Sequence, residues 1–343
     1  LHLAMEALGI GERDTVVVPT MTFAATAEVV RYVGARPLLV DCRESDFNLD
    51  VADARTRVEK AVESGANVKA IIPVHFAGQV GDVGGVASLA SDYDLKIVED
   101  AAHCCPAYYR PSEEGQWQPV GASADITCFS FYANKTITTG EGGMACTDSD
   151  DYADRMRIMS LHGISRDAWK RYCPGSSWYY EIIAPGYKYN MADISASIGI
   201  HQLRAADRLF ARRASLAARY SSNLAEVDEL VLPSEAINRK HSWHLYVIRL
   251  RKGVTQIDRN ELILELNQRG VGTSVHFTPL HMHPYYRETY GYQRHDCPES
   301  SRLYDEIVTL PLYPEMSDED IDYVCESIRD ILNKHQSARV LVR

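Results

Sequence analysis

Short apolar runs alternate with longer amphipathic segments over the first 100 residues of the chain. The short runs are rich in β-branched residues, which is typical of buried strands, whereas apolar spacings of three and four in the longer segments indicate helices. The predicted strands cover residues 15–18, 38–40, 68–74 and 95–98, and the predicted helices cover residues 23–33, 51–62 and 83–91. This alternation predicts an α/β fold with a mainly parallel sheet between two layers of helices.

The pattern changes in the second half, where a long helical segment precedes another set of alternating elements. The predicted elements are a helix at residues 192–220, a strand at 243–250, a helix at 259–269 and a last helix with Ile321, Val324, Ile328 and Ile331 on one face. We therefore expect a large domain at residues 1–222 and a smaller C-terminal α/β domain at residues 223–343. A chain of 343 residues is long enough to bury both cores.

Composition excludes some classes of function. The net charge of −11, from 47 acidic and 36 basic residues, argues against a nucleic-acid-binding surface. No apolar run approaches the roughly 18 residues needed to cross a bilayer. The eight cysteines contain no C-x-x-C pair, so we expect free thiols and a cytoplasmic enzyme. His276, His281 and His283 lack a supporting cysteine or carboxylate cluster, and we predict no metal site.

One lysine follows an apolar alternating stretch and precedes a glycine-rich turn. The stretch at residues 126–131 predicts the end of a buried strand, and Lys135 lies just beyond it. A lysine that is partly desolvated at such a position loses proton affinity, and a neutral amine can form a Schiff base. A lone lysine at such a position is usually a solvated loop residue, and the sequence around Lys135 is what favours the reactive amine.

An acidic pair ends the strand predicted at residues 95–98. Asp100 follows Glu99 at the carboxyl end of this strand, where α/β sheets commonly open onto a ligand crevice. An aspartate there can face a cationic ring nitrogen, and a protonated pyridine ring is what makes pyridoxal phosphate an electron sink. The alternative is that Asp100 caps the helix that follows it.

These segments together resemble the DegT-type (DegT/DnrJ/StrS) sugar aminotransferases, a family of fold-type-I pyridoxal phosphate enzymes. The likeness rests on Glu-Asp-Ala-Ala-His at residues 99–103, Phe-Ser-Phe-Tyr-Ala-Asn-Lys at 129–135, Thr-Gly-Glu-Gly-Gly at 139–143 and Pro-Gly-Tyr-Lys-Tyr-Asn-Met at 185–191. Further matching segments lie at residues 17–23, 74–79, 276–281 and 310–314, so nearly the whole chain is covered. The resemblance implies a large domain with a mainly parallel seven-stranded sheet between helices, and a smaller C-terminal α/β domain.

The resemblance also implies roles for individual residues around pyridoxal 5'-phosphate. Lys135 matches the Schiff-base lysine, which also moves the proton during catalysis, and Asp100 matches the residue that holds the pyridine nitrogen. His103 matches a position beside the ring, with helix capping as its alternative. Phe23 matches the aromatic residue that stacks on the ring, although a phenylalanine is also an ordinary core residue. Ser130 matches a phosphate-binding serine, whose hydroxyl donates to an anion without adding charge.

Two further matches concern assembly and phosphate binding. In the family, a residue near Lys188 and Asn190 crosses a dimer interface to the neighbour's phosphate, so we expect a homodimer with shared active sites. Many members have asparagine where this chain has Lys188, and interface packing is an equal alternative for both residues. Members also carry a Gly/Ser-Thr-Ala turn before the helix that receives the phosphate. The sequence starts within a segment similar to that helix, at Leu1, and we expect the natural protein to have preceding residues.

The expected reaction is a transamination from L-glutamate to a keto sugar linked to a nucleotide. The segments at residues 163–169 and 181–190 are similar to enzymes that aminate UDP-linked 4-keto sugars, of the 4-amino-4-deoxyarabinose type, whereas residues 134–140 resemble the GDP-sugar perosamine synthases. The loop with His276, His281 and Tyr285 matches a segment that lines the substrate entrance, although loop packing explains these residues as well. A cyclitol or antibiotic-precursor aminotransferase and a non-catalytic pyridoxal-phosphate-binding regulator stay as alternatives.

Overall fold

The computed structural model describes residues 1–112, 114–165 and 179–335 and has a six-stranded sheet at its centre. The strand order is β2-β1-β3-β4-β7-β8, with parallel pairing except between β7 and β8. The strands are β1 (Asp14–Pro19), β2 (Arg36–Val40), β3 (Asn67–Ile71), β4 (Lys96–Asp100), β7 (Ile126–Ser130) and β8 (Gly143–Cys146). The predicted parallel α/β architecture is present. The central sheet has six strands among the described residues, whereas seven were expected. The number seven came from the family resemblance and not from strand-like segments of this sequence.

Side chains of β1 alternate between two cores, one on each face of the sheet. Val16 and Val18 pack with α1, α2 and α5, whereas Val17 packs with α3 and α4. Successive side chains of a strand point to opposite faces, so a parallel sheet covered on both faces is apolar throughout. The helices are α1 (His2–Ala7), α2 (Ala25–Tyr32), α3 (Val51–Glu63), α4 (Val83–Tyr93) and α5 (Asp150–Ser160).

Helix starts in this region are fixed by side-chain caps. The carboxylate of Asp50 accepts hydrogen bonds from the backbone N–H groups of Ala52 and Asp53 at the start of α3, and Asp82 does the same for Gly85 in α4. Such caps satisfy backbone donors that have no partner within the helix. The starts of α3 and α4, predicted from the amphipathic pattern, agree with the observed ones to the residue.

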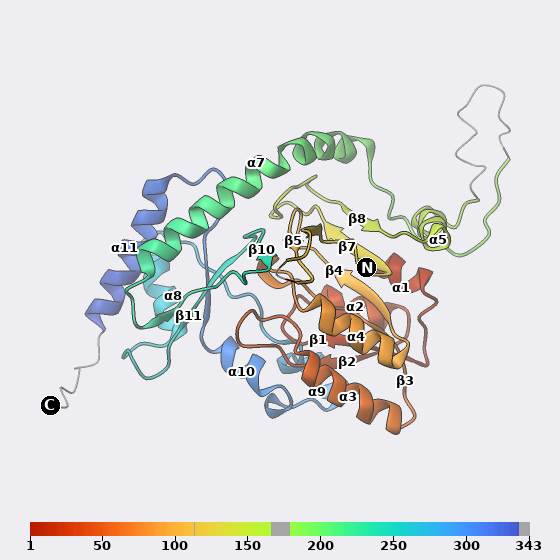
Figure 1. The fold of residues 1–343 in the computed structure, drawn as a ribbon, viewed down its shortest axis with the longest axis horizontal. Helices are drawn as coiled ribbons and strands as arrows, with labels where there is room; N and C mark the ends of the chain where they lie inside the picture. The colour runs from red at the N-terminus through yellow and green to blue at the C-terminus, as the bar shows by residue number, and fades with distance from the viewer. Residues whose placement is uncertain (113, 166–178, 336–343) are drawn as a thin grey trace.

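The long helix α7 (Asp193–Leu224) links the sheet to a second core. Figure 1 shows α7 extending from the region of β8 to the C-terminal helix α11 (Asp318–Lys334). Its second half contributes Leu216, Tyr220 and Leu224 to an apolar cluster shared with α11 and a small antiparallel sheet. That cluster also includes α8 (Arg259–Gln268), and the sheet consists of β9 (Leu230–Val231), β11 (Tyr246–Leu250) and β12 (Ile307–Leu310). The domain boundary at residues 222/223 stays a prediction and falls inside α7.

Parts of the C-terminal segment return to the first core. Leu280 and Tyr286 are buried against the large sheet, in the same cluster as α1 and α2. In addition, β10 (Arg239–Lys240) pairs with β5 (Tyr108–Tyr109), which also pairs with β6 (Gln118–Pro119). The remaining short helices are η1 (Phe76–Gly78), η2 (Leu280–Met282), α9 (Pro284–Tyr290), η3 (Arg294–Asp296) and α10 (Pro298–Tyr304). The linear pattern missed these returns because they depend on contacts far apart in the sequence.

Within the described ranges, no helix combines the length and apolarity that crossing a bilayer requires. Of the segments that carry the sugar-nucleotide resemblance, residues 166–169 lie outside the described residues.

Candidate active site

A cavity of about 760 Å³ opens at the carboxyl ends of β4 and β7. It collects residues that are far apart in the sequence, because parallel strands end at the same edge of a sheet. The predicted residues that line it are Phe23, Asp100, His103, Ser130, Lys135 and His276. The structure therefore brings together six of the ten predicted site residues around one space.

Asp100 is the last residue of β4 and is held rigidly at the cavity wall. Its Oδ2 accepts a hydrogen bond from Thr26 Oγ1 at 2.8 Å, and its Oδ1 accepts one from the backbone N–H of Ala102 at 3.2 Å. The hydroxyl of Thr22 lies 2.9 Å from that of Thr26 and extends this chain of hydrogen bonds. A buried carboxylate fixed in this way stays ready to hold a cation in the cavity.

Lys135 lies in the turn that follows β7. Its backbone N–H donates to the carbonyl of Tyr132 at 3.0 Å, which fixes the turn, and its side chain is partly buried at the cavity. Burial lowers the pKa of Lys135 from its usual value of 10.5, and the negative charge of Asp100 opposes this shift only in part. The amine is therefore easier to deprotonate than a surface lysine, as a nucleophile requires.

Three imidazoles and a phenyl ring complete the wall of the cavity. The rings of His103 and His244 lie 4.3 Å apart between centroids, and the ring of Phe277 is stacked beside His103 at 6.2 Å. Burial, assisted by the charge of Lys135, holds the pKa of His103 well below its usual value of 6.5. Burial likewise lowers the pKa of His276 to about 4. Burial also lowers the pKa of His244. The three histidines are therefore neutral hydrogen-bonding groups near pH 7.

Two nitrogen atoms in this wall lack partners. His103 Nδ1 and His244 Nδ1 are buried and make no hydrogen bond with any residue that the structure describes. Buried polar atoms without partners are uncommon, and they are expected where a ligand supplies the missing partner. Phe23 lines the cavity, and its side chain is 62% exposed, so it offers an apolar surface to a ligand. The cavity thus offers a flat ring, a carboxylate, a lysine and unsatisfied imidazole nitrogens to one ligand.

Two predicted substrate residues lie outside this cavity. His281 is fully buried in η2, where Nδ1 contacts Thr20 Oγ1 at 2.7 Å and Nε2 contacts Ser301 Oγ at 2.9 Å. Both ring nitrogens are used, so His281 joins its loop to the large sheet, and we do not carry it into the proposed site. Tyr285 is half exposed on α9, and its hydroxyl accepts a hydrogen bond from Arg31 Nε at 3.2 Å.

Lys188 and Asn190 also lie away from the cavity of the single chain. Both are exposed, and Lys188 Nζ donates to Asn190 Oδ1. Their predicted contact is with the phosphate of a neighbouring subunit, so this position is compatible with the prediction, which stays untested. Among the described residues, no group of three or more histidines, cysteines or carboxylates is placed to bind a metal ion.

Comparison with known proteins gives the family. The model of the DegT/DnrJ/EryC1/StrS aminotransferase family matches residues 1–329. The chain belongs to this family.

Individual relatives agree with this family assignment. The spore coat polysaccharide biosynthesis protein SpsC of Bacillus subtilis is 41% identical over 333 residues, which is 97% of this chain and 82% of that protein. An uncharacterized protein of Methanocaldococcus jannaschii is 43% identical over 336 residues, which is 98% of this chain and 84% of that protein. The putative sugar aminotransferase Spr1654 from Streptococcus pneumoniae in its PMP form superposes with a TM-score of 0.87 at 32% identity, over 97% of this chain and 85% of that one.

The chain is thus a sugar aminotransferase of the fold-type-I class, and pyridoxal phosphate is its cofactor. The residues of the cavity fit this cofactor, because its ring, phenolic oxygen and pyridine nitrogen match an exposed phenyl ring, unpartnered imidazole nitrogens and a fixed carboxylate. When bound, the cofactor supplies an electron sink for the pair of electrons released on deprotonation of an amino-group donor.

The structure also places at the site three residues that the sequence interpretation did not identify. Thr26 fixes Asp100, His244 faces the cavity with a free nitrogen, and Phe277 stacks beside His103. Thr22 precedes α2 and Thr26 lies in its first turn, so no helical spacing in the sequence identified the pair. No local signal identifies His244, because the small antiparallel sheet brings it to the cavity.

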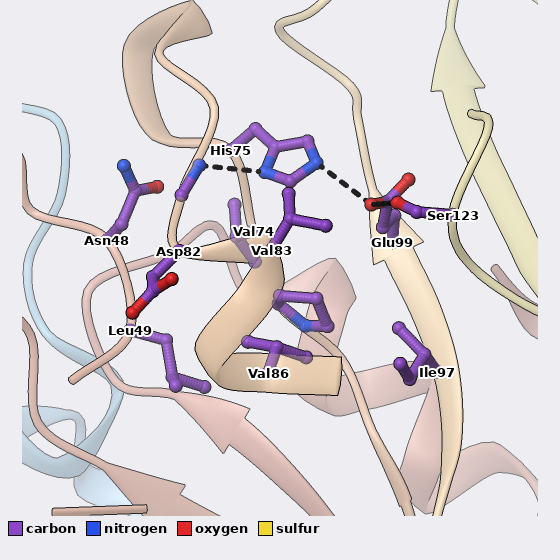
Figure 2. Close-up of a pocket in the computed structure, with 12 residues that line it drawn as sticks. Asn48, Leu49, Val74, His75, Asp82, Val83, Val86, Ile97, Glu99 and Ser123 are labelled. Atoms are coloured by element: carbon purple, nitrogen blue, oxygen red, sulfur yellow. Dashed lines mark hydrogen bonds and ion pairs between the residues drawn. The ribbon is translucent and has the colours of Figure 1, made fainter. Parts of the chain in front are cut away.

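A second buried acidic group lies directly behind the aminotransferase cavity. Glu99 and Asp100 are consecutive in β4, so their side chains point to opposite faces of the sheet. Figure 2 shows Glu99 on the α4 side, facing His75 and Ser123. Its Oε2 accepts from Thr127 Oγ1 at 2.7 Å, its Oε1 accepts from Ser123 Oγ at 3.2 Å, and His75 Nε2 lies 3.6 Å from Oε1.

This arrangement stabilises the strand that carries Asp100. The backbone N–H of His75 donates to the carbonyl of Asp100 at 3.2 Å. The contact between His75 and Glu99 is thereby linked to the site. Burial by itself raises the pKa of Glu99, but the contacts with His75, Thr127 and Ser123 outweigh burial and leave the pKa below 4.5. Glu99 is therefore charged at neutral pH and acts on the site only by holding β4 in place.

We expect Glu99→Gln to lower the free energy of unfolding by about 1–3 kcal/mol near pH 7, the usual cost of disturbing a buried charged hydrogen-bond group. The folded pKa is lower than the unfolded one, so this contribution is complete above 4.5 and is lost as the pH falls through the folded pKa. Urea unfolding at several pH values measures the difference, and the exposed Glu59→Gln is the control. A deficit that stays constant on acidification would contradict this account.

Proposed function

We propose that this aminotransferase moves the amino group of L-glutamate to a keto sugar carried on UDP or GDP. The observation that supports it is the position of Lys135 and Asp100 at one cavity of about 760 Å³, large enough for a cofactor together with a sugar. Glutamate as donor comes from the family resemblance, and the nucleotide as carrier comes from the segments at residues 134–140, 163–169 and 181–190. SpsC, whose name refers to spore coat polysaccharide, is consistent with a product used in a surface polysaccharide.

The residues of the cavity then have distinct tasks. Lys135 would hold the cofactor and would then hold or return the proton of the substrate carbon, for which its lowered pKa suits it. Asp100 holds the pyridine nitrogen in its protonated state. Phe23 would cover one face of the ring, His103 would lie beside the phenolic oxygen, and Ser130 would donate to the phosphate. His276 and the half-exposed Tyr285 would contact the nucleotide sugar at the entrance.

A homodimer is part of this proposal. Large apolar side chains are exposed along the first half of α7, with Ile194 at 78%, Ile198 at 43% and Leu203 at 64% exposure. A monomeric protein rarely exposes an apolar stripe of this kind on one helix, so we infer that a second copy covers it. Lys188 and Asn190 precede this helix directly, and in such a dimer they would reach the phosphate in the partner's cavity.

Single-turnover spectroscopy on the pyridoxal-phosphate-loaded protein tests the proposal. We expect glutamate to remove the visible absorbance of the bound cofactor, and a UDP- or GDP-linked 4-keto sugar to restore it with formation of an amino sugar. Restoration by a keto cyclitol alone would favour the cyclitol aminotransferase. A coloured protein that responds to no amino donor would favour the regulator and would contradict the proposed reaction.

A further inference from the structure

The turn between β10 and β11 carries His244, which lines the active-site cavity. All residues from 241 to 245 are buried. Trp243 has a backbone φ of 50°, which lies in the left-handed region that a bulky side chain rarely adopts. Its ring stacks on that of His241 at 4.1 Å between centroids, and its backbone N–H donates to His241 Nδ1 at 2.8 Å. A strained conformation persists only where its surroundings fix it, so the position of His244 is fixed as well.

The same turn also holds the backbone of His103. The backbone N–H of Ser242 donates to the carbonyl of Gly78 at 3.0 Å, and its hydroxyl donates to the carbonyl of His103. A side chain at Gly78 is incompatible with this contact, because a Cβ atom there would overlap Ser242 Oγ. The backbone of His103 and the ring of His244 are therefore placed by one rigid segment.

Two aromatic rings lie beside the imidazole of His103. The ring of His244 is the nearer, at 4.3 Å between centroids and 39° between planes, and the ring of Phe277 lies at 6.2 Å and 21°. Within the described part of the chain, neither His103 Nδ1 nor His244 Nδ1 has a hydrogen-bond partner. The two histidines are therefore in contact through their flat rings and not through a hydrogen bond between these nitrogens. Packing orients the imidazole of His103, and His244 provides the closest ring contact.

We propose that His244 is a positioning residue, whose ring holds the imidazole of His103 in the orientation that meets the phenolic oxygen of the cofactor. This inference rests on the proposed function, which assigns that oxygen to His103. Burial lowers the pKa of His244 well below 6.5, so the ring is neutral and adds no charge beside His103. A group that contacts a ligand must be held to within about 0.5 Å, and packing against a fixed neighbour is how its rotation is prevented.

A titration of the visible absorbance of the pyridoxal-phosphate-loaded protein tests this inference apart from turnover. A hydrogen bond donated to the phenolic oxygen favours the less protonated form of the bound cofactor, so its loss should move the midpoint to higher pH. We expect His103→Ala to raise the midpoint by about one pH unit, as for a lost hydrogen bond to a charged group. His244→Ala should raise it by at least about half a unit. The double variant should shift no further than His103→Ala, because the two residues act as one unit.

Two other substitutions of His244 separate ring contact from hydrogen bonding. His244→Phe keeps a flat ring and should bring the midpoint back to within about 0.2 pH unit of the wild type. His244→Gln keeps a hydrogen-bonding group without the ring and should behave like His244→Ala. His295→Ala removes a histidine whose side chain is 83% exposed and is the control, with an unchanged midpoint. If His244→Ala does not fold, Ser242→Ala replaces it and should shift the midpoint in the same direction.

Three results would overturn the inference: an unchanged midpoint in the folded variant, additive shifts in the double variant, or recovery by His244→Gln but not by His244→Phe. Removal of the visible absorbance of the wild type by glutamate tests the proposed function separately. Removal by glutamate without the predicted shifts would leave the proposed function standing and reject the role of His244. The predicted shifts in a protein that responds to no amino donor would contradict the proposed reaction and support the role of His244.

Discussion

Lys135→Ala is expected to abolish turnover, with a rate loss of at least about 10⁴-fold, because one side chain is both the nucleophile and the proton carrier. Burial already lowers the pKa of this amine, and no other lysine lines the active-site cavity, according to the described residues. The variant should still bind pyridoxal phosphate without a covalent bond, since Asp100, Phe23 and Ser130 are unchanged.

Two measurements check this result. Steady-state amination of the keto sugar gives the rate, and borohydride reduction followed by peptide mapping shows whether the cofactor is fixed at residue 135. Lys252→Ala, which removes an exposed lysine paired with Asp305, is the control for the loss of a lysine as such. Normal activity of Lys135→Ala, or a cofactor fixed at another lysine in the wild type, would rule out the assigned role.

The second large effect is expected from Asp100→Asn, which keeps the shape of the side chain and removes its charge. The rate should fall by about 10²–10³-fold, the range seen when a preorganised electrostatic partner is removed from a reaction centre. The pyridine nitrogen would no longer be held protonated, so the cofactor would accept electrons poorly. Cofactor binding should persist, because the lysine and the phosphate contacts remain.

A paired variant separates the charge of Asp100 from its position. Thr26→Val removes the hydroxyl that donates to Asp100 Oδ2 at 2.8 Å but leaves the carboxylate in place, so we expect less than about tenfold loss of rate. Single-turnover kinetics with glutamate measure both variants, and Asp92→Asn, at an exposed ion pair with Arg55, is the control. Unchanged kinetics in Asp100→Asn would exclude the role of this carboxylate at the ring nitrogen.

Local pattern was sufficient to predict most of the parallel sheet and its helices. The start of α3 at Val51 and the end of β2 at Val40 were predicted to the residue, since strand and helix periodicities and caps are properties of neighbouring residues. The return of Leu280 and Tyr286 to the large core was not predicted, because burial of a loop residue depends on which surface is near it in space.

In the candidate site, too, local sequence pattern identified some residues and only the tertiary structure identified others. Lys135 and Asp100 were identified because each lies at a strand end with a characteristic sequence around it. His281 was predicted as a substrate residue because its loop matches a family segment that lines the substrate entrance, whereas the structure places both its ring nitrogens within hydrogen-bonding distance of buried hydroxyls. His244 carries no local signal, because only the fold brings the segment before β11 to the cavity at the ends of β4 and β7.

The sequence by itself determined the chemistry of the protein: a lysine after β7, an aspartate ending β4 and the segments of a sugar aminotransferase family. Only the tertiary structure decided that Asp100 faces the cavity while its neighbour Glu99 faces α4, and that His244 lies in the wall of the same cavity. The reason is physical. Residue type and spacing are encoded locally, whereas desolvation and the choice of partner depend on packing between segments distant in the chain.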